Sequence, residues 1–298
     1  MTIGSAPRVS VLMPAYNAAR TIRRACASLI AQTFEDWECV VVDDGSHDET
    51  AELVEQIHDT RFRVIRLQEN VGRGAARQIA LENSRGKFVA FLDADDWWYP
   101  EKLKRQLHVM EVVGSDIVST GMAIISPSEE LKGVSVRDDR AAPVIMKEWR
   151  RLGRAPVAFG PSLVKGELAR SCRFDPRLRR SQDYDFLIQA CFRRGACAVL
   201  QEVLYAYERG ASNAPAVVLQ AYKYARKAHW KNFFRDPVGA GAGLALSYMK
   251  SVVVWGLSKI GGAHALAERR YQRPSERQSA EYAAALRTVK RVMEGLPR

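Results

Sequence analysis

The chain has 298 residues, 47% of them hydrophobic and 27% charged, which is the balance of a folded protein with a sizeable core. Five cysteines without a C-x-x-C pair favour buried free thiols over a zinc site or disulfides, and the first nine residues hold no apolar run of signal-peptide length. We therefore expect a cytoplasmic protein. The net charge of +11 is concentrated in residues 216–298, where 15 Lys and Arg stand against 5 Asp and Glu.

Strand-like and helix-like segments alternate along the first half of the chain, with a repeat of roughly 25 residues. This alternation predicts an α/β fold with a mostly parallel central sheet and helices on both faces. The expected strands are 9–13, 38–42, 63–67 and 88–92, and the expected helices are 19–32, 46–58 and 74–84. Ser46, with Glu49 three residues later, predicts a capping box at the start of the second helix.

Beyond Pro100 the alternation is looser. Residues 101–113 have the spacing of an amphipathic helix, and residues 126–143 are polar and rich in loop-forming residues. Two further strands are expected at 116–125 and 198–207, with a helix at 181–195 before the second of them.

The distinctive polar residues follow directly after expected strands. Tyr16 and Asn17 come after the first strand, Asp43 and Asp44 after the second, and residues 93–96 after the fourth. In parallel α/β sheets, ligands bind at the carboxyl ends of the strands. This placement predicts a binding site at that edge of the sheet.

The segment Asp93-Ala94-Asp95-Asp96 is the strongest signal for chemistry. Side chains two apart on an extended chain point to the same side, so Asp93 and Asp95 offer a pair of hard oxygen ligands. Such a pair suits Mg²⁺ or Mn²⁺, which take their remaining ligands from water and substrate phosphates. The structural alternative is that Asp95 or Asp96 caps the helix that starts near Pro100.

Three other segments are weaker when taken singly. Asp44 is able to accept a hydrogen bond from a base or a ribose, or simply to belong to the turn before the next helix. The glycine-containing segment 70–77 fails as a dinucleotide motif because Arg77 stands where Gly or Ala is needed and because it does not follow the first strand. Asp183 opens an expected helix, where it either interacts with the helix dipole or serves as a general base.

These segments, in this order, closely resemble glycosyltransferase family 2, the inverting enzymes with the GT-A fold. The resemblance covers about residues 8–210 and implies a nucleotide-diphospho-sugar transferase fold with a C-terminal helical extension. Within it, Gln78 and Gln182 depart from the Asn and Glu that are usual in the family. The implied donor-binding residues are Pro14, Ala15, Tyr16, Asn17, Asp44, Arg77, Asp93, Ala94 and Asp95.

The resemblance also implies roles for individual side chains. Asp183 would be the catalytic base, and Asp95, with Asp93, would hold the divalent metal beside the donor diphosphate. The expected donor is a nucleotide-sugar, with a UDP-sugar favoured, and the acceptor is a saccharide or lipid-linked saccharide. Tyr16 would stack on the base, with Asp44 and Arg77 at its edge. Weaker expectations place Trp97 and Trp98 in the sugar pocket, or in packing, and Arg209 and Ser212 over the diphosphate.

The basic C-terminal part favours contact with an anionic partner. Residues 216–235 have the pattern of a basic amphipathic helix, and 238–262 are apolar apart from Lys250 and Lys259. The longest uncharged stretch there has 12 residues, short of the ~18 that a membrane-spanning helix needs. We expect residues 216–262 to lie on an anionic membrane surface at the inner face of the cell membrane. The alternative is that these helices pack on the catalytic domain.

The sequence thus predicts a catalytic domain of residues 1–215 and an extension of residues 216–298. The expected activity is inverting sugar transfer to an acceptor hydroxyl, in the assembly of a cell-surface polysaccharide or lipid-linked oligosaccharide. The alternatives are a polyprenyl-phosphate glycosyltransferase and a non-catalytic protein that binds a sugar-nucleotide or an anionic polymer. Nucleic acid is not an expected partner, because the chain has no zinc-finger or RNA-binding signature.

Overall fold

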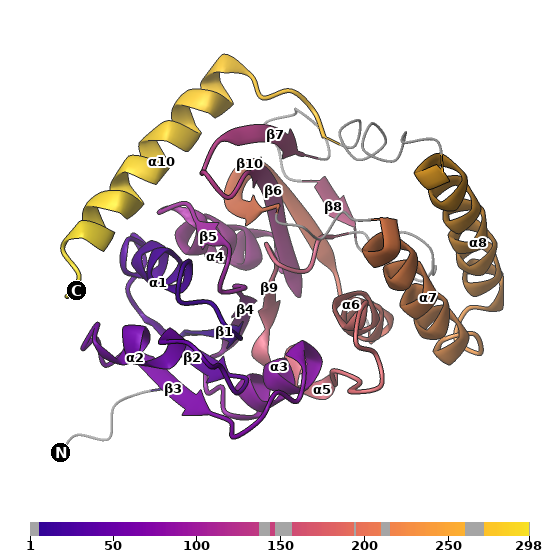
Figure 1. The fold of residues 1–298 in the computed structure, drawn as a ribbon, viewed down its shortest axis with the longest axis horizontal. Helices are drawn as coiled ribbons and strands as arrows, with labels where there is room; N and C mark the ends of the chain where they lie inside the picture. Colours follow the sequence, from indigo (N-terminus) through magenta and orange to yellow (C-terminus); the bar gives the residue numbers. More distant parts are fainter. Residues whose placement is uncertain are drawn as a thin grey trace.

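The structure is a computed structural model that describes residues 6–136, 144–146, 157–193, 195–209, 215–259 and 271–297. Its strands form one sheet in the order β3-β2-β1-β4-β9-β6-β10-β5, with β7 beside β6 and β8 beside β10. Helices cover both faces of this sheet (Figure 1). This α/β architecture agrees with the predicted fold class.

The first part of the sheet is parallel, as expected. Its strands are β1 (Val9–Ala15), β2 (Trp37–Asp43), β3 (Phe62–Arg66) and β4 (Phe88–Phe91). Strand β1 lies between β2 and β4 and pairs with both in parallel. The carboxyl ends of β1, β2 and β4 therefore meet at one edge of the sheet.

The second part of the sheet is mixed, so the parallel share is smaller than predicted. Strand β6 (Ile117–Ile125) runs parallel to β10 (Cys197–Glu208), whereas β9 (Leu163–Lys165) is antiparallel to both β4 and β6. Antiparallel pairing also adds three short edge strands, whose sequences contain no long β-branched run that would predict a strand. They are β5 (Trp97–Trp98), β7 (Leu131–Ser135) and β8 (Val144–Met146).

Alternation along β1 divides the core into two layers. Val9, Val11 and Met13 pack on one face of the sheet, and Leu12 packs on the other. The first face is covered by α1 (Ile22–Ile30), α2 (Thr50–Glu55), α4 (Lys102–Val113) and α10 (Glu276–Glu294). The second is covered by α3 (Arg73–Glu82), α5 (Gly166–Ser171) and α6 (Gln182–Phe192). All five cysteines are buried and free, which confirms that prediction.

The predicted capping box at Ser46 is wrong. Helix α2 begins at Thr50, with Glu49 at its N-cap position and no side-chain cap. The Ser46 hydroxyl instead accepts a hydrogen bond of 2.9 Å from the backbone N–H of Asn17. A tertiary contact between the loops after β1 and β2 has therefore displaced the local helix signal.

The C-terminal helices differ in their surroundings. Helix α10 lies along α1 (Figure 1), and its Tyr282 hydroxyl donates a 2.6 Å hydrogen bond to the Glu129 carbonyl. Helices α7 (Pro215–Lys231) and α8 (Pro237–Lys259) pair with each other at the far side of α6. Within the part of the chain that the structure describes, α8 alone is long and apolar enough to cross a membrane. The uncharged stretch of 12 residues is thus part of a longer apolar helix that continues through Lys250.

Candidate active site

A pocket of about 460 Å³ opens at the carboxyl ends of β1, β2 and β4. Such a position is where ligands bind in parallel α/β sheets. All but one of the expected donor-binding residues line it, and Arg77 is the exception. The lining residues are Pro14, Ala15, Tyr16, Asn17, Ala18, Arg20, Thr21, Asp44, Asn70, Arg73, Asp93, Ala94, Asp95 and Glu208.

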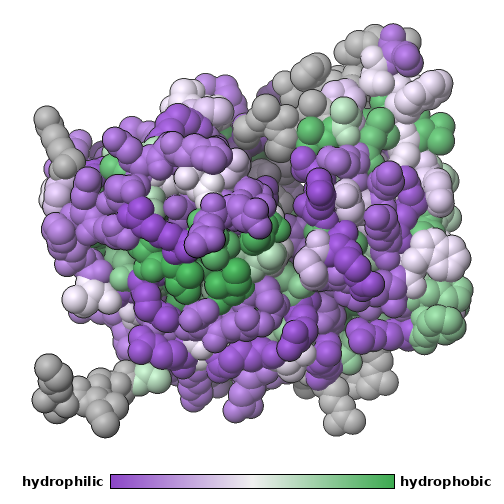
Figure 2. All heavy atoms as spheres, turned by 60° about the horizontal axis from the view of Figure 1, so that its bottom comes forward, coloured by the Kyte–Doolittle hydropathy of each residue, from purple (hydrophilic) through white to green (hydrophobic). Residues whose placement is uncertain are grey.

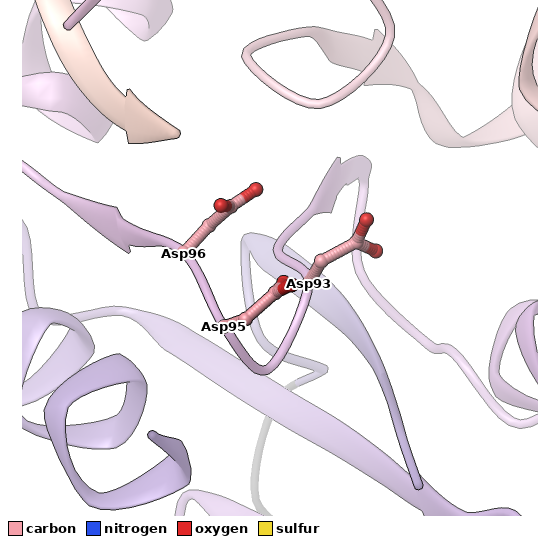
Figure 3. Close-up of side chains that lie close together, drawn as sticks. All are labelled: Asp93, Asp95 and Asp96. Carbon is pink, nitrogen blue, oxygen red and sulfur yellow. The ribbon is translucent and has the colours of Figure 1, made fainter. Parts of the chain in front are cut away.

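Residues 93–96 form a turn between β4 and β5, where the sequence suggested an extended chain. The backbone N–H of Asp96 donates to the Asp93 carbonyl at 3.0 Å and closes this turn. One carboxylate oxygen from each of Asp93, Asp95 and Asp96 lies within 4.8 Å of the others. Figure 3 shows the three side chains pointing to the same side of the turn. The turn thus gathers three carboxylates that an extended strand would have spread apart.

Asp93 is held by two guanidinium groups. Arg77 donates to its carboxylate at 2.6 Å, and Arg73 lies 3.6 Å from the other oxygen. Burial opposes ionisation of Asp93, but the charges of Arg77 and Arg73 outweigh it and hold the pKa of this carboxyl below its ordinary value. Asp93 is therefore a carboxylate at neutral pH.

Asp95, in contrast, makes no side-chain hydrogen bond or ion pair with a guanidinium among the described residues, and the only charge that favours its ionisation is that of the more distant Arg73. Its side chain opens into the pocket, although protein atoms surround it closely. Burial is the larger cause and repulsion from Asp93 the smaller one, and together they raise its pKa to about 6. A carboxylate that is costly to ionise without a partner is one that a cation would stabilise. The backbone beneath it is fixed, because the Arg24 guanidinium donates to the Asp95 carbonyl at 2.7 Å.

Asp96 belongs to the core. Both its oxygens accept hydrogen bonds, from the Tyr205 hydroxyl at 2.5 Å and from the backbone N–H of Glu208 at 2.8 Å. Burial, with the charges of Asp95 and Asp93, raises the pKa of Asp96 well above its ordinary value. Helix α4 begins at Lys102 without a side-chain cap, so the helix-cap alternative for Asp95 and Asp96 is wrong.

The loops after β1 and β2 form the other wall of the pocket. Asp44 accepts hydrogen bonds from the backbone N–H groups of Val71 and Gly72, at 2.8 and 3.0 Å, and ties this wall to the start of α3. Tyr16 is 45% exposed at the pocket, which leaves its ring free to receive a planar base. Gly45 has a φ of +71°, and a Cβ atom there would clash with the backbone of residues 69–70.

Arg77 does not lie where the sequence suggested. It is buried, its guanidinium bonds to Asp93, and it stacks 4.8 Å from the centre of the Phe159 ring. It therefore positions Asp93, and the expectation that it contacts the edge of a base is wrong.

Asp183 lies on the first turn of α6, half-buried, outside the residues that line the pocket. Its carboxylate accepts a 2.8 Å hydrogen bond from the backbone N–H of Tyr184. The charge of Arg73 connects it to the pocket, because the carboxylates of Asp93, Asp95 and Asp183 all raise the pKa of Arg73. Arg73 thus interacts electrostatically with both the aspartate turn and Asp183 at the start of α6.

The weaker site expectations fare differently. Trp97 and Trp98 are fully buried, and the Trp97 ring stacks on the Tyr99 ring with 5.4 Å between their centres. The expectation that these tryptophans line the sugar pocket is therefore wrong, and the alternative that they pack in the core holds. The Arg209 guanidinium lies 5.6 Å from the centre of the Tyr271 ring and does not line the pocket. Ser212 lies outside the described residues.

Six of the lining residues were not predicted from the sequence, among them Arg73 and Glu208. Arg73 stands between Gly72 and Gly74 at the start of α3. A cation at a helix N-terminus, beside a carboxylate cluster, was the signal that could have identified this residue. Glu208 is the last residue of β10 and pairs with Arg20 at 2.5 Å and Arg24 at 2.6 Å. Nothing local distinguishes Glu208, because only the pairing of β10 with β6 brings it to the pocket.

Comparison with known proteins assigns the family. Residues 10–155 match the family model described as glycosyl transferase family 2. An uncharacterised glycosyltransferase of Methanocaldococcus jannaschii is 30% identical over 238 residues, which is 76% of this chain and 80% of that protein. The chain belongs to glycosyltransferase family 2. The succinoglycan biosynthesis protein ExoO of Rhizobium meliloti, another relative, is 32% identical over 69% of this chain. The chain spans 62% of the length of ExoO.

Solved structures show the same fold. The Staphylococcus aureus TarS fragment 1–349 superposes with a TM-score of 0.63 at 21% identity, over 96% of this chain and 81% of that one. The same fragment is known in complex with UDP and with UDP-GlcNAc. A relative from Escherichia coli, 40% identical over 34% of this chain and 40% of its own length, is named UDP-Glc:α-D-GlcNAc-diphosphoundecaprenol β-1,3-glucosyltransferase.

Proposed function

We propose that the protein is an inverting glycosyltransferase that moves a sugar from a nucleotide-diphosphate sugar, with UDP as the favoured nucleotide, to an acceptor hydroxyl. The observation that carries the proposal is the pocket where Tyr16, Asp44 and the aspartate turn converge. An exposed aromatic ring suits the base, and the aspartate turn suits a diphosphate with its cation. Its membership of family 2 and the names of its relatives support a place in polysaccharide or lipid-linked oligosaccharide assembly.

We assign the base to Asp183. Its place on the first turn of α6, with the charge of Arg73 linking it to the aspartate turn, suits a group that takes the acceptor proton while the oxygen attacks the anomeric carbon. Attack from the face opposite the diphosphate inverts the configuration. Arg73 is placed to balance negative charge on the departing diphosphate.

The residues of the aspartate turn fit a divalent metal. Asp95 offers a carboxylate that no guanidinium holds among the described residues, and Asp93 has one oxygen on Arg77 and the other at a longer distance from Arg73. Asp95 would hold Mg²⁺ or Mn²⁺ with help from Asp93, whereas Asp96 has both oxygens occupied within the core. When bound, the metal would supply positive charge to the diphosphate.

Metal affinity is expected to depend on pH through Asp95. Its pKa of about 6 means that a proton competes for this carboxylate below that pH. We expect Mn²⁺ binding to be nearly constant above pH 7 and to weaken by roughly tenfold per pH unit below pH 6, since one proton is displaced. Isothermal titration with Mn²⁺ from pH 5 to 8 checks this. An affinity that is flat across the range would argue against Asp95 as the ligand.

A thermal-shift screen tests donor binding. UDP-, GDP- and TDP-sugars are added with and without Mn²⁺, and stabilisation by one nucleotide only with metal is expected. Equal responses to all three, or none, would argue against the proposed pocket.

We further propose a division into a catalytic domain of residues 1–215 and an extension of 216–298, part of which docks on membrane. Helix α8 carries an outward apolar face, with Val238 81% exposed, Val252 67% and Trp255 58%. Figure 2 shows hydrophobic side chains along the edge on the right, where Figure 1 places α8. Lys223, Lys227 and Lys250 are exposed on the same pair of helices and suit anionic lipid.

Contacts between α7 and α8 favour a helix lying on the surface over one that spans. Gly239, Gly243 and Ser247 of α8 are buried, and Arg226 of α7 donates to the Ser247 hydroxyl at 3.3 Å. A spanning α8 would lose this packing and place Lys250 in hydrocarbon at a cost of ~2.5–3.5 kcal/mol. These contacts support a peripheral position at the inner face of the cell membrane, where a lipid-linked saccharide would be within reach.

Vesicle flotation separates surface docking from simple packing. We expect the protein to float with vesicles containing anionic lipid and to stay at the bottom with neutral ones. The double variant Val252→Asp/Trp255→Asp should lose flotation, because it places charge on the exposed apolar face. Val112→Asp, an exposed apolar residue on α4, serves as the control. Equal flotation of both variants would refute the docking face.

A further inference from the structure

Helix α6, which carries the proposed base, is held along one side by α7. Two residues after Asp183, the Asp185 carboxylate is fully buried, and two of its donors come from the end of α7. Lys231 Nζ lies 2.9 Å from it and Asn232 Nδ2 lies 3.1 Å away, while Gln189 of α6 donates at 2.8 Å. A buried carboxylate must be paired, so this contact fixes α6 against α7.

The geometry of a helix turns this contact into an orientation for the base. Residues two apart on an α-helix project about 200° from each other. When one of the two side chains is fixed toward a neighbouring helix, the other therefore points away from that neighbour. With Asp185 directed toward α7, Asp183 faces away from it, and its charge interacts with that of Arg73, which also lies 3.6 Å from the Asp93 carboxylate. The position of Asp183 therefore depends on a contact made by the extension.

The start of α6 needs such support. Ser181, which precedes the helix, has a φ of +59°, a conformation that costs free energy for any residue with a Cβ atom. Its hydroxyl donates to the Ala221 carbonyl of α7 at 3.2 Å, and Arg180 donates to the Gln220 side chain at 3.0 Å. Helix α7 thus holds the strained turn from which the base projects.

The packing between α6 and α7 continues to α8. The His229 ring of α7 lies edge-on to the Tyr184 ring of α6, with 5.4 Å between ring centres. The His229 ring also rests against Gly243 of α8, where a Cβ atom would overlap the ring. The three helices form one packed unit (Figure 1), and α8 carries the exposed apolar face.

We infer that α7 is a positioning element for the catalytic base, with Lys231, Asn232 and Asp185 as the positioning residues. This inference rests on the proposed function, because it assigns the partners of Asp183 in that reaction. The extension is then part of the catalytic unit. The pair of helices proposed to touch the membrane includes the helix that positions the catalytic base.

The test uses the full chain and compares Lys231→Met with Lys104→Met, which removes an exposed lysine from α4. Turnover is measured as acceptor-dependent release of UDP, and donor binding as the stoichiometry and affinity for UDP with Mn²⁺. We expect Lys231→Met to lower kcat by roughly tenfold or more, with donor KM and UDP binding within twofold, because misplacing a reacting group by 1 Å costs up to ~100-fold. Lys231→Arg, which keeps a charged donor, should recover most of the turnover.

A double-mutant cycle distinguishes positioning from general loosening. In an Asp183→Asn background, Lys231→Met should cause no further fall in kcat, because the residue through which it acts is already gone. The same fractional loss in both backgrounds, or a kcat of Lys231→Met equal to that of Lys104→Met, would overturn the inference. If Lys231→Met does not fold, Lys231→Gln is measured instead, and an unchanged kcat would contradict the inference. Full turnover by Asp183→Asn alone would instead overturn the proposed function.

Discussion

Asp95→Asn is expected to abolish metal-dependent sugar transfer, with a loss of roughly 10²–10³-fold or more in kcat. The substitution removes the carboxylate that lines the pocket and that forms no ion pair with a guanidinium among the described residues. Folding should not suffer. Burial and Asp93 raise the folded-state pKa of Asp95 to about 6, so above that pH the ionised group costs stability, and the neutral amide removes that cost.

Three measurements on Asp95→Asn check this expectation: turnover with Mn²⁺, Mn²⁺ affinity and the melting temperature at pH 7.5. Glu167→Gln, which neutralises an exposed carboxylate on α5, is the matched control and should behave as wild type. Loss of turnover with an unchanged or higher melting temperature supports a ligand role. Wild-type affinity for Mn²⁺ in Asp95→Asn would contradict it.

Asp183→Asn is expected to remove the base while leaving the donor site intact. The pocket is lined without Asp183, so affinity for UDP with Mn²⁺ should stay within about twofold of wild type. Turnover should fall by roughly 10²–10⁴-fold, the usual contribution of a positioned base. The amide keeps an oxygen that is able to accept from the Tyr184 N–H, so the start of α6 should hold.

The measurement is a steady-state titration of donor and acceptor with Asp183→Asn and wild type side by side. A fall in kcat with constant donor KM is the expected result. An unchanged kcat would exclude Asp183 as the base. A parallel loss of UDP binding would show that the residue belongs to the donor site.

Much of the donor pocket was predictable because its parts follow strands with strong local patterns. The apolar runs before Tyr16, Asp44 and Asp93 marked β1, β2 and β4, and parallel pairing then brought their ends together. The four segments also carried the family resemblance, which supplied the role of Asp183 and which no single segment would have justified.

The sequence could not show what depends on distant contacts. Ser46 had a capping signal, but Asn17 from another loop takes its hydroxyl. Trp97 and Trp98 followed the aspartates directly, yet antiparallel pairing with β10 draws both into the core. Lys231 looked like one more charge on a basic helix, and only the packing of α7 on α6 brings it to Asp185.

The configuration of the product tests the central claim most directly. Wild-type protein, Mn²⁺ and the donor chosen by the thermal-shift screen are incubated with a panel of aryl glycosides and lipid-linked saccharides, and the anomeric proton of the product is followed by NMR. The account predicts acceptor-dependent release of the nucleoside diphosphate and a glycoside whose anomeric configuration is opposite to that of the donor. A product that retains the donor configuration, or release of nucleoside diphosphate that no acceptor accelerates, would contradict it.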